Sequence, residues 1–148
     1  RTYLVVIDDS PEATLALRFA ARRAARTGGA VMVLAIVPPQ DFLAFGGVQA
    51  TIEAEAREQA EALAAAAAEA VAQEANVVPK ILVKSGKPAE VVREVIGTSD
   101  EVARARDGTS GPPGPLVAHF TGHDAGTLPC PVMLVPGGID IERLDALS

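Results

Sequence analysis

The run Tyr3-Leu4-Val5-Val6-Ile7 contains no charged residue and ends at Asp8-Asp9-Ser10-Pro11. A continuous apolar run that is bounded by turn residues is typical of a strand buried on both faces of a parallel sheet. Ser10 suits the cap of the next helix, and Pro11 suits its first turn. Asp8 and Asp9 are therefore predicted at the carboxyl end of a central strand, where open α/β sheets bind ligands.

The same alternation of strand and helix patterns continues along the chain. Gly28-Gly29 ends the first helix, and Pro38-Pro39 ends the second strand. Proline is confined to the edges and starts of strands, so Pro79 predicts that the third strand lies at the edge of the sheet. The predicted elements are helix 11–27, strand 30–37, loop 40–47, helix 51–75, strand 77–83 and helix 88–96.

Composition excludes several classes of function. The net charge of −6 argues against nucleic-acid binding, and the helical arginines are expected to form a solvated outer face. No apolar run is long enough to span a membrane. The single cysteine, Cys130, excludes an internal disulfide and fits a cytoplasmic protein. The helical arginines that are expected to form the solvated face are Arg18, Arg22, Arg23 and Arg26.

The fourth strand is the weak point of the pattern. Glu101 to Asp107 carries two arginines and two carboxylates where a buried strand is needed, and unpaired buried charge is costly. One hypothesis is a compensated frame slip, because codons for Arg104-Ala105-Arg106-Asp107 exist that read Ala-Leu-Val-Met one nucleotide later. If the charges are genuine, we expect poor order or a distorted edge strand here. Codons incompatible with this overlap would exclude the slip.

The last part of the chain is predicted from its prolines and glycines. Pro115 starts a short helix over 116–120, and Gly122 is expected to interrupt it before a loop that reaches Pro129. Val132-Met133-Leu134-Val135 is the last strand. The domain is predicted to span residues 1–138, followed by a short amphipathic tail over 139–148.

Four segments together resemble the universal stress protein family. They are Asp8-Asp9-Ser10 after the first strand, the helix start Gly86-Lys87-Pro88, the loop Gly108-Thr109-Ser110-Gly111, and the strand Pro129-Cys130-Pro131-Val132-Met133-Leu134-Val135-Pro136. Each segment alone is weakly specific, but together they occur in the order of that family, over nearly the whole chain and at the family's usual length.

The resemblance implies a single-domain, doubly wound, five-stranded parallel sheet in the order 3-2-1-4-5, with helices on both faces. It also implies a site for ATP or AMP between the first and fourth strands. The residues assigned to that site are Asp8, Asp9, Val37, Gly108, Thr109, Ser110, Gly111 and Gly122. Members that bind ATP do so through a loop of the form Gly-x2-Gly-x9-Gly-Ser/Thr.

The glycine loop of this chain departs from that form. Ten residues, not nine, separate Gly111 from Gly122, and His123 stands where a hydroxyl residue is usual. Three prolines remove backbone donors, and Asp124 adds negative charge near the expected phosphate position. The nucleotide site is therefore predicted to be degenerate.

Several residues have an ordinary structural interpretation beside the functional one. Asp8 and Asp9 either contact a ligand or serve as a helix cap and a solvated carboxylate. Ser10 is read as a cap and not as a nucleophile. His119 and His123 are read as surface histidines, so no metal site is predicted. The hydroxyls of Thr109 and Ser110 either bind phosphate or are ordinary loop hydroxyls, and Cys130 is read as a packed thiol.

Three functions remain open from the sequence. The first is a non-enzymatic stress-response module that acts by dimerisation and by contact with a protein partner. The second is an ATP or AMP sensor, and the third is a slow ATP hydrolase, for which no catalytic residue is visible. In the resembled family the last strand makes a dimer contact, so a homodimer through Val132, Met133, Leu134 and Val135 is predicted.

Overall fold

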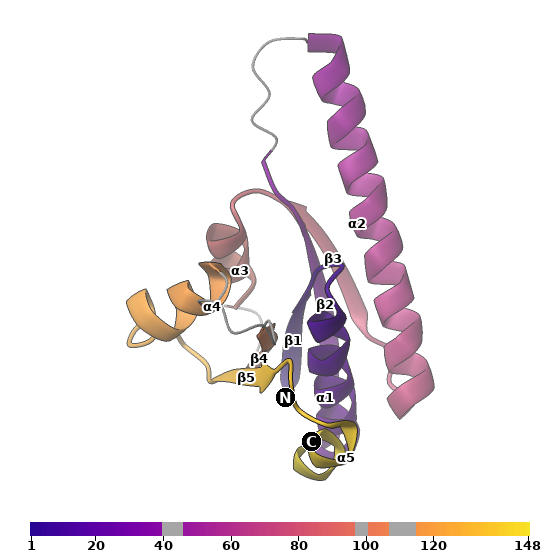
Figure 1. The fold of residues 1–148 in the computed structure, drawn as a ribbon, viewed down its shortest axis with the longest axis vertical. Helices are drawn as coiled ribbons and strands as arrows, with labels where there is room; N and C mark the ends of the chain where they lie inside the picture. The colour runs from indigo at the N-terminus through magenta and orange to yellow at the C-terminus, as the bar shows by residue number, and fades with distance from the viewer. Residues whose placement is uncertain (40–45, 97–100, 107–114) are drawn as a thin grey trace.

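The computed structural model describes residues 1–39, 46–96, 101–106 and 115–148, and for residues 46–49, 101–106 and 123 it describes the backbone. All strand pairs are parallel, in the order β3-β2-β1-β4-β5, as the family resemblance implies. Figure 1 shows the sheet with helices packed around it, so a single α/β domain is confirmed. The strands are β1 (Thr2–Ile7), β2 (Ala30–Val37), β3 (Lys80–Ser85), β4 (Glu101–Arg106) and β5 (Val132–Pro136).

Helices cover both faces of the sheet, because successive side chains of each strand point to opposite sides. Tyr3 and Val5 belong to a core with α1 and α2, whereas Leu4 and Leu34 belong to a core with α3 and Phe120. The helices are α1 (Pro11–Thr27), α2 (Gly46–Ala75), α3 (Pro88–Ile96), α4 (Pro115–Ala118), the π-helical turn η1 (His119–His123) and α5 (Ile141–Leu147). None of the helices in the described ranges is long and apolar enough to cross a membrane.

Both ends of α1 lie where the sequence predicts them. The hydroxyl of Ser10 accepts a hydrogen bond from the backbone N–H of Ala13 at 3.3 Å, which satisfies a donor that the helix itself cannot satisfy. Gly28 ends the helix in the left-handed conformation, with φ of 65°, and its N–H bonds the carbonyl of Ala24. The cap at Ser10 fixes the chain directly after Asp8 and Asp9, the two carboxylates that follow β1.

The third and fourth strands differ in part from the sequence-based prediction. β3 does lie at the sheet edge, but it begins at Lys80, so Val77 and Val78 precede it and Pro79 is not inside it. β4 spans Glu101–Arg106 between β1 and β5, so the expectation of a distorted edge strand is wrong. Asp107 lies outside the described residues.

Two helix boundaries also needed correction. α2 begins at Gly46, five residues before the predicted start at Thr51, and Figure 1 shows its first turns projecting beyond the sheet. Of the predicted loop 40–47, residues 40–45 lie outside the described part of the chain. Gly122 does not interrupt the helix that begins at Pro115, because it lies within η1. A widened turn accommodates the glycine and continues the helical path.

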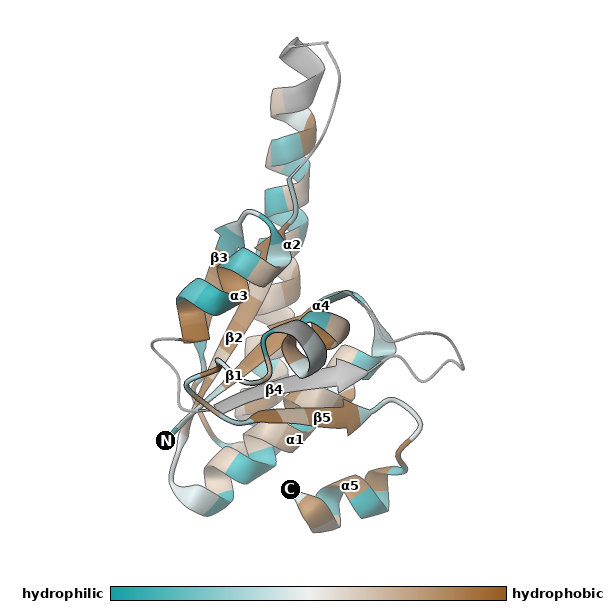
Figure 2. Cartoon of the chain, turned by 90° about the vertical axis from the view of Figure 1, so that its left-hand side faces the viewer, coloured by the Kyte–Doolittle hydropathy of each residue, from teal (hydrophilic) through white to brown (hydrophobic). Residues whose placement is uncertain are grey.

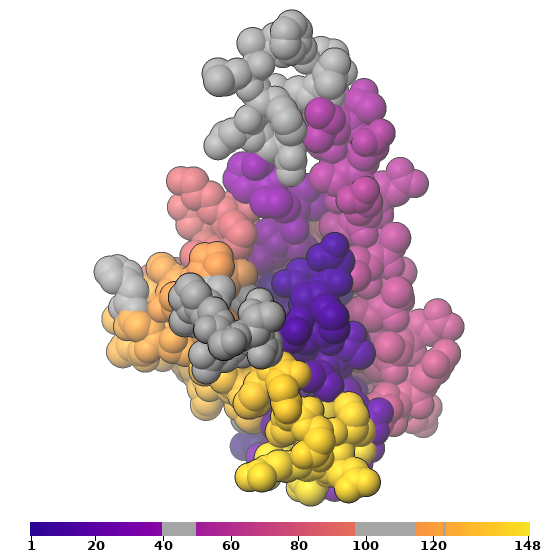
Figure 3. Space-filling view, in the orientation of Figure 1, coloured from indigo at the N-terminus to yellow at the C-terminus, as the bar shows by residue number. Residues whose placement is uncertain are grey.

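The arginines of α1 do not form a purely solvated face. Arg18 contacts Glu74 of α2 and Asp145 of α5, each at 2.8 Å, and Arg22 contacts Glu74 at 3.1 Å. These contacts tie the predicted tail to the domain: in Figure 3, α5 (yellow) packs against α1 (indigo), and Leu144 is buried in the same core. The prediction failed because the two carboxylates lie far from α1 in the sequence.

Candidate functional site

The carboxyl ends of β1 and β2 form one side of a cavity, and α2 forms the other. Register places Ile7 beside Ala35, so the residues that follow both strands emerge at the same edge of the sheet. The cavity has a volume of about 330 Å³, and three of the predicted site residues, Asp8, Asp9 and Val37, line it. The remaining lining residues are Ile7, Ala35, Ile36, Pro38, Ala56, Gln59, Ala60 and Leu63.

Asp8 has a structural role in this wall. One carboxylate oxygen, Oδ1, accepts hydrogen bonds from the backbone N–H of Ser10 at 3.0 Å and from its hydroxyl. Ser10 in turn caps α1, so the hydrogen bonds to Asp8 fix the position of the capping residue. Both Asp8 and Asp9 are exposed to solvent. For Asp8, a part in the helix cap and a contact with a ligand are compatible, since its second carboxylate oxygen can also accept hydrogen bonds.

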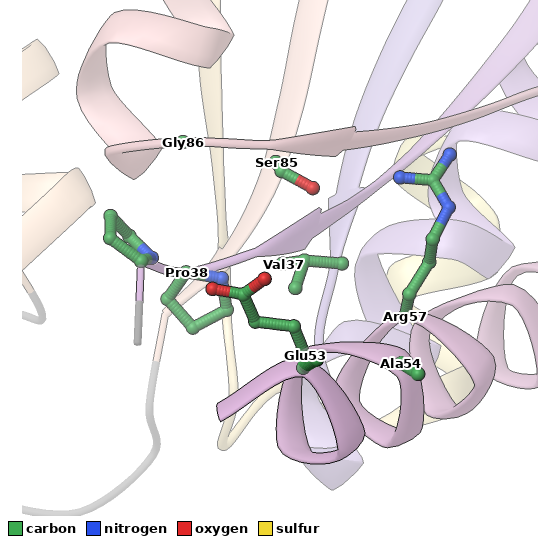
Figure 4. Close-up of a pocket in the computed structure, with 9 residues that line it drawn as sticks. Val37, Pro38, Glu53, Ala54, Arg57, Ser85 and Gly86 are labelled. Carbon is green, nitrogen blue, oxygen red and sulfur yellow. The ribbon is translucent and has the colours of Figure 1, made fainter. Parts of the chain in front are cut away.

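A second cavity adjoins the first and shares Val37 and Pro38 with it. Its volume is about 580 Å³, and it lies between α2 and the carboxyl ends of β2 and β3 (Figure 4). Gly86 holds the end of β3 against β2, because its N–H donates to the carbonyl of Val37 at 3.1 Å. Its φ of 144° lies in the region that favours glycine. The other lining residues are Pro39, Ala50, Glu53, Ala54, Arg57 and Ser85.

Asp124 is largely buried, and its charge is balanced by α3 and η1. Its Oδ2 atom accepts hydrogen bonds from Arg93 Nε at 2.8 Å and pairs with His119 Nε2 at 2.9 Å. Burial alone would raise the carboxyl pKa, but the hydrogen bond and charge of Arg93, with the charge of His119, hold the pKa below its usual value. The negative charge that the sequence predicts beside a phosphate is therefore paired within the protein.

The structure brings together only part of the predicted site. Gly108, Thr109, Ser110 and Gly111 lie outside the described residues. Gly122 is exposed within η1 and is not among the residues that line either cavity. Within the described ranges, no cluster of three or more histidine, cysteine or acidic side chains could hold a metal ion.

Sequence reasoning missed the contribution of α2. Glu53 and Arg57 line the second cavity, and Gln59 lines the first. Nothing in the sequence separates these residues from the other charged and polar positions of a long helix rich in alanine and glutamate. Gly86, which also lines the second cavity, was interpreted only as part of the start of α3.

Comparison with known proteins decides the family. The model of the universal stress protein family matches residues 1–136. The chain belongs to the universal stress protein family. The match spans all five strands and ends at Pro136, the last residue of β5, so α5 lies beyond it. A search of curated proteins finds no match.

Solved universal stress proteins share the fold at low sequence identity. UspA from Lactobacillus plantarum superposes with a TM-score of 0.73 at 21% identity, over 90% of this chain and 96% of the other. A universal stress protein in complex with cAMP gives 0.62 at 17% identity, over 91% of this chain and 96% of the other. A family member from Arabidopsis thaliana with AMP bound gives 0.57 at 15%, over 96% and 93%.

Proposed function

We propose that this protein is a non-enzymatic stress-response module whose cavity binds the nucleoside part of an adenine nucleotide. The single observation that carries the proposal is the meeting of Asp8, Asp9 and Val37 in one cavity at the carboxyl ends of β1 and β2. Relatives with the same fold have been solved with cAMP and with AMP. The cavity volume of about 330 Å³ falls within the usual range for small-molecule sites.

The chemistry of the cavity favours a nucleoside over a triphosphate. Carboxylates accept hydrogen bonds from ribose hydroxyls, and apolar residues such as Ile36 and Val37 suit the face of a base. The same carboxylates repel phosphate, and the prolines at 112, 113 and 115 remove backbone donors from the glycine loop. The phosphate half of the site is thus degenerate.

Calorimetric titration with adenosine, AMP and ATP, with and without Mg²⁺, tests this proposal. Adenosine is expected to bind, and its affinity is expected to be at least equal to that of ATP. Asp9→Asn should weaken adenosine binding about tenfold, the value of one charge-assisted hydrogen bond. Asp140→Asn, which changes an exposed aspartate outside both cavities, is the matched control.

Two results would contradict the proposal. ATP binding tenfold tighter than adenosine would identify an ATP sensor with a working phosphate loop. Steady release of phosphate from ATP, abolished in Asp8→Ala, would identify a hydrolase.

The proposal includes self-association through β5. This strand lies at the edge of the sheet, and the side chain of Leu134 on it is 42% exposed. An edge strand offers unpaired backbone groups to a second copy. Figure 2 shows β5 as a strongly hydrophobic strand at that edge. A contact of this kind would present the same surface on both subunits.

Sedimentation across a concentration series measures the self-association. The wild type is expected to sediment as a dimer and Leu134→Arg as a monomer. Val78→Arg is the control, because Val78 is 89% exposed just before β3, the opposite edge strand. A monomeric wild type, or a Leu134→Arg dimer of unchanged strength, would contradict a β5 interface.

A further inference from the structure

A small apolar groove lies between β5 and α5 and shares no lining residue with the two larger cavities. Its volume is about 70 Å³, whereas pockets that hold small molecules usually measure roughly 300–1,000 Å³. All of the residues that line it are apolar. Two of them, Leu134 of β5 and Leu147 of α5, have 42% and 57% of their surface exposed. The groove therefore suits an apolar side chain better than a small-molecule ligand.

The helical positions of α5 show which way Leu147 faces. Leu144 is buried in the core, and Asp145, the next residue, contacts Arg18 of α1 at 2.8 Å. Successive residues of an α-helix are about 100° apart, so Leu147 follows Leu144 by about 300° and lies on the flank opposite Asp145. That flank points away from the contact with α1 and shares the groove with Leu134. Figure 2 shows α5 next to β5, at that edge of the sheet.

The two edges of the sheet differ in their protection against pairing with another chain. β3 carries Lys80 and Lys84, and lysines on an edge strand oppose such pairing. β5 has no charged side chain, and only its last residue, Pro136, is a proline. The edge that is open to a second copy of the chain is therefore the one beside the groove.

The edge of β5 alone offers too little surface for a stable dimer. A stable interface buries about 800 Å² on each partner, which corresponds to roughly 20–30 residues a side. β5 has five residues. In strand addition the backbone hydrogen bonds supply affinity, and side-chain pockets supply the specificity for one partner. A second copy that pairs with β5 thus needs further apolar surface, and the groove beside it supplies that surface.

We propose that α5 is part of the self-association surface and that the groove receives Leu147 of a second copy of the chain. The inference rests on the proposed contact through β5 and deepens it. Two identical edge strands related by a two-fold axis pair antiparallel, with the axis perpendicular to the sheet, so each face of the sheet continues across the axis. The two α5 helices then lie on the same face, one on each side of the axis. No charged side chain lines the groove, so two identical copies meet there without repulsion.

Sedimentation equilibrium of the full chain tests the proposal. Leu147→Arg is expected to weaken the dimer about tenfold or more, because an unpaired charge would be buried in an apolar contact. Leu147→Met keeps an apolar side chain of similar size and should associate like the wild type. Ala146→Arg is the matched control, since Ala146 is exposed on α5 and does not line the groove. Its dissociation constant should stay within about threefold of the wild-type value, as for other surface substitutions.

Urea denaturation separates a role in association from a role in folding. At a protein concentration at which the wild type is dissociated, Leu147→Arg and Ala146→Arg should unfold at the wild-type midpoint, because both positions are exposed within the subunit. A lower midpoint for Leu147→Arg alone would assign Leu147 to the fold of the subunit and overturn the inference.

The outcomes also distinguish this inference from the proposed contact through β5. A dimer that Leu134→Arg dissociates and Leu147→Arg leaves unchanged would overturn the role of α5 and leave the β5 contact standing. Tighter association of Leu147→Arg would identify α5 as a shield of the edge and overturn the inference as well. A monomeric wild type, or a dimer insensitive to both substitutions, would overturn the β5 contact together with this inference.

Discussion

Truncation of Leu144 measures how strongly α5 is attached to the domain. Leu144 is 1% exposed and belongs to the core formed with α1. Replacing a buried leucine by alanine usually costs about 2–5 kcal/mol, because apolar contacts are lost and a cavity remains. Leu144 already adjoins a small cavity of about 70 Å³ between α5, β5 and Phe19, so fewer contacts are lost than in a dense core. We therefore expect Leu144→Ala to lower the free energy of unfolding by about 2 kcal/mol.

Urea denaturation followed by circular dichroism gives this value, and the melting temperature should fall by about 4–8 °C. Leu147→Ala is the matched control, since Leu147 belongs to the same seven-residue helix but is 57% exposed. Its effect should stay within about 0.5 kcal/mol. Equal effects of the two substitutions would show that α5 does not pack through Leu144, and the assignment of the tail to the domain core would be wrong.

Three further substitutions, one of them with a matched control, test other contacts. Ser10→Ala removes the cap of α1 and should cost about 1 kcal/mol in urea denaturation. Gly86→Ala should cost about 1–3 kcal/mol, because φ is 144° and the new Cβ would lie 3.0 Å from a methyl of Val91, whereas Gly138→Ala meets no atom within 4 Å and should be nearly neutral. The hydrogen bond from Arg18 lowers the pKa of Asp145, so its stabilisation is present above its unfolded pKa of about 3.9 and is lost as pH falls through the lower folded value. Asp145→Asn should therefore be less stable than wild type at pH 7, and that difference should shrink at pH 3, as measured by urea midpoints.

The fold could be predicted from the sequence wherever one local signal excluded the alternatives. The apolar run 3–7 could bury both faces only in the interior of a parallel sheet. The edge position of β3 was predicted from a proline inside the strand, but Pro79 precedes β3, so that reasoning did not determine it. Ser10 and Gly28 fixed the ends of α1 because each satisfies backbone groups that a helix leaves open. These signals act over a few residues, so tertiary structure did not override them.

Long-range pairing could not be predicted in the same way. Arg18 has the same sequence neighbours whether it faces water or Asp145, which lies 127 positions away. Gly122 carries a strong helix-breaking signal, yet it lies within η1. The candidate site shows the same division: Asp8, Asp9 and Val37 stand at or just after the ends of strands, whereas Glu53 and Arg57 are indistinguishable in the sequence from the other polar positions of α2.

α2 is a single rigid rod of about 45 Å, the length expected of its 30 residues. Its first half forms a wall of both cavities, and its last turn presents Glu74 to Arg18 and Arg22, which also hold α5. Continuous backbone hydrogen bonds make a helix stiff. A ligand that shifted the first half of α2 would therefore also shift Glu74 at its other end. In mechanical terms α2 would then act as a lever: a ligand bound against its first half would be coupled through Glu74, Arg18 and Arg22 to α5.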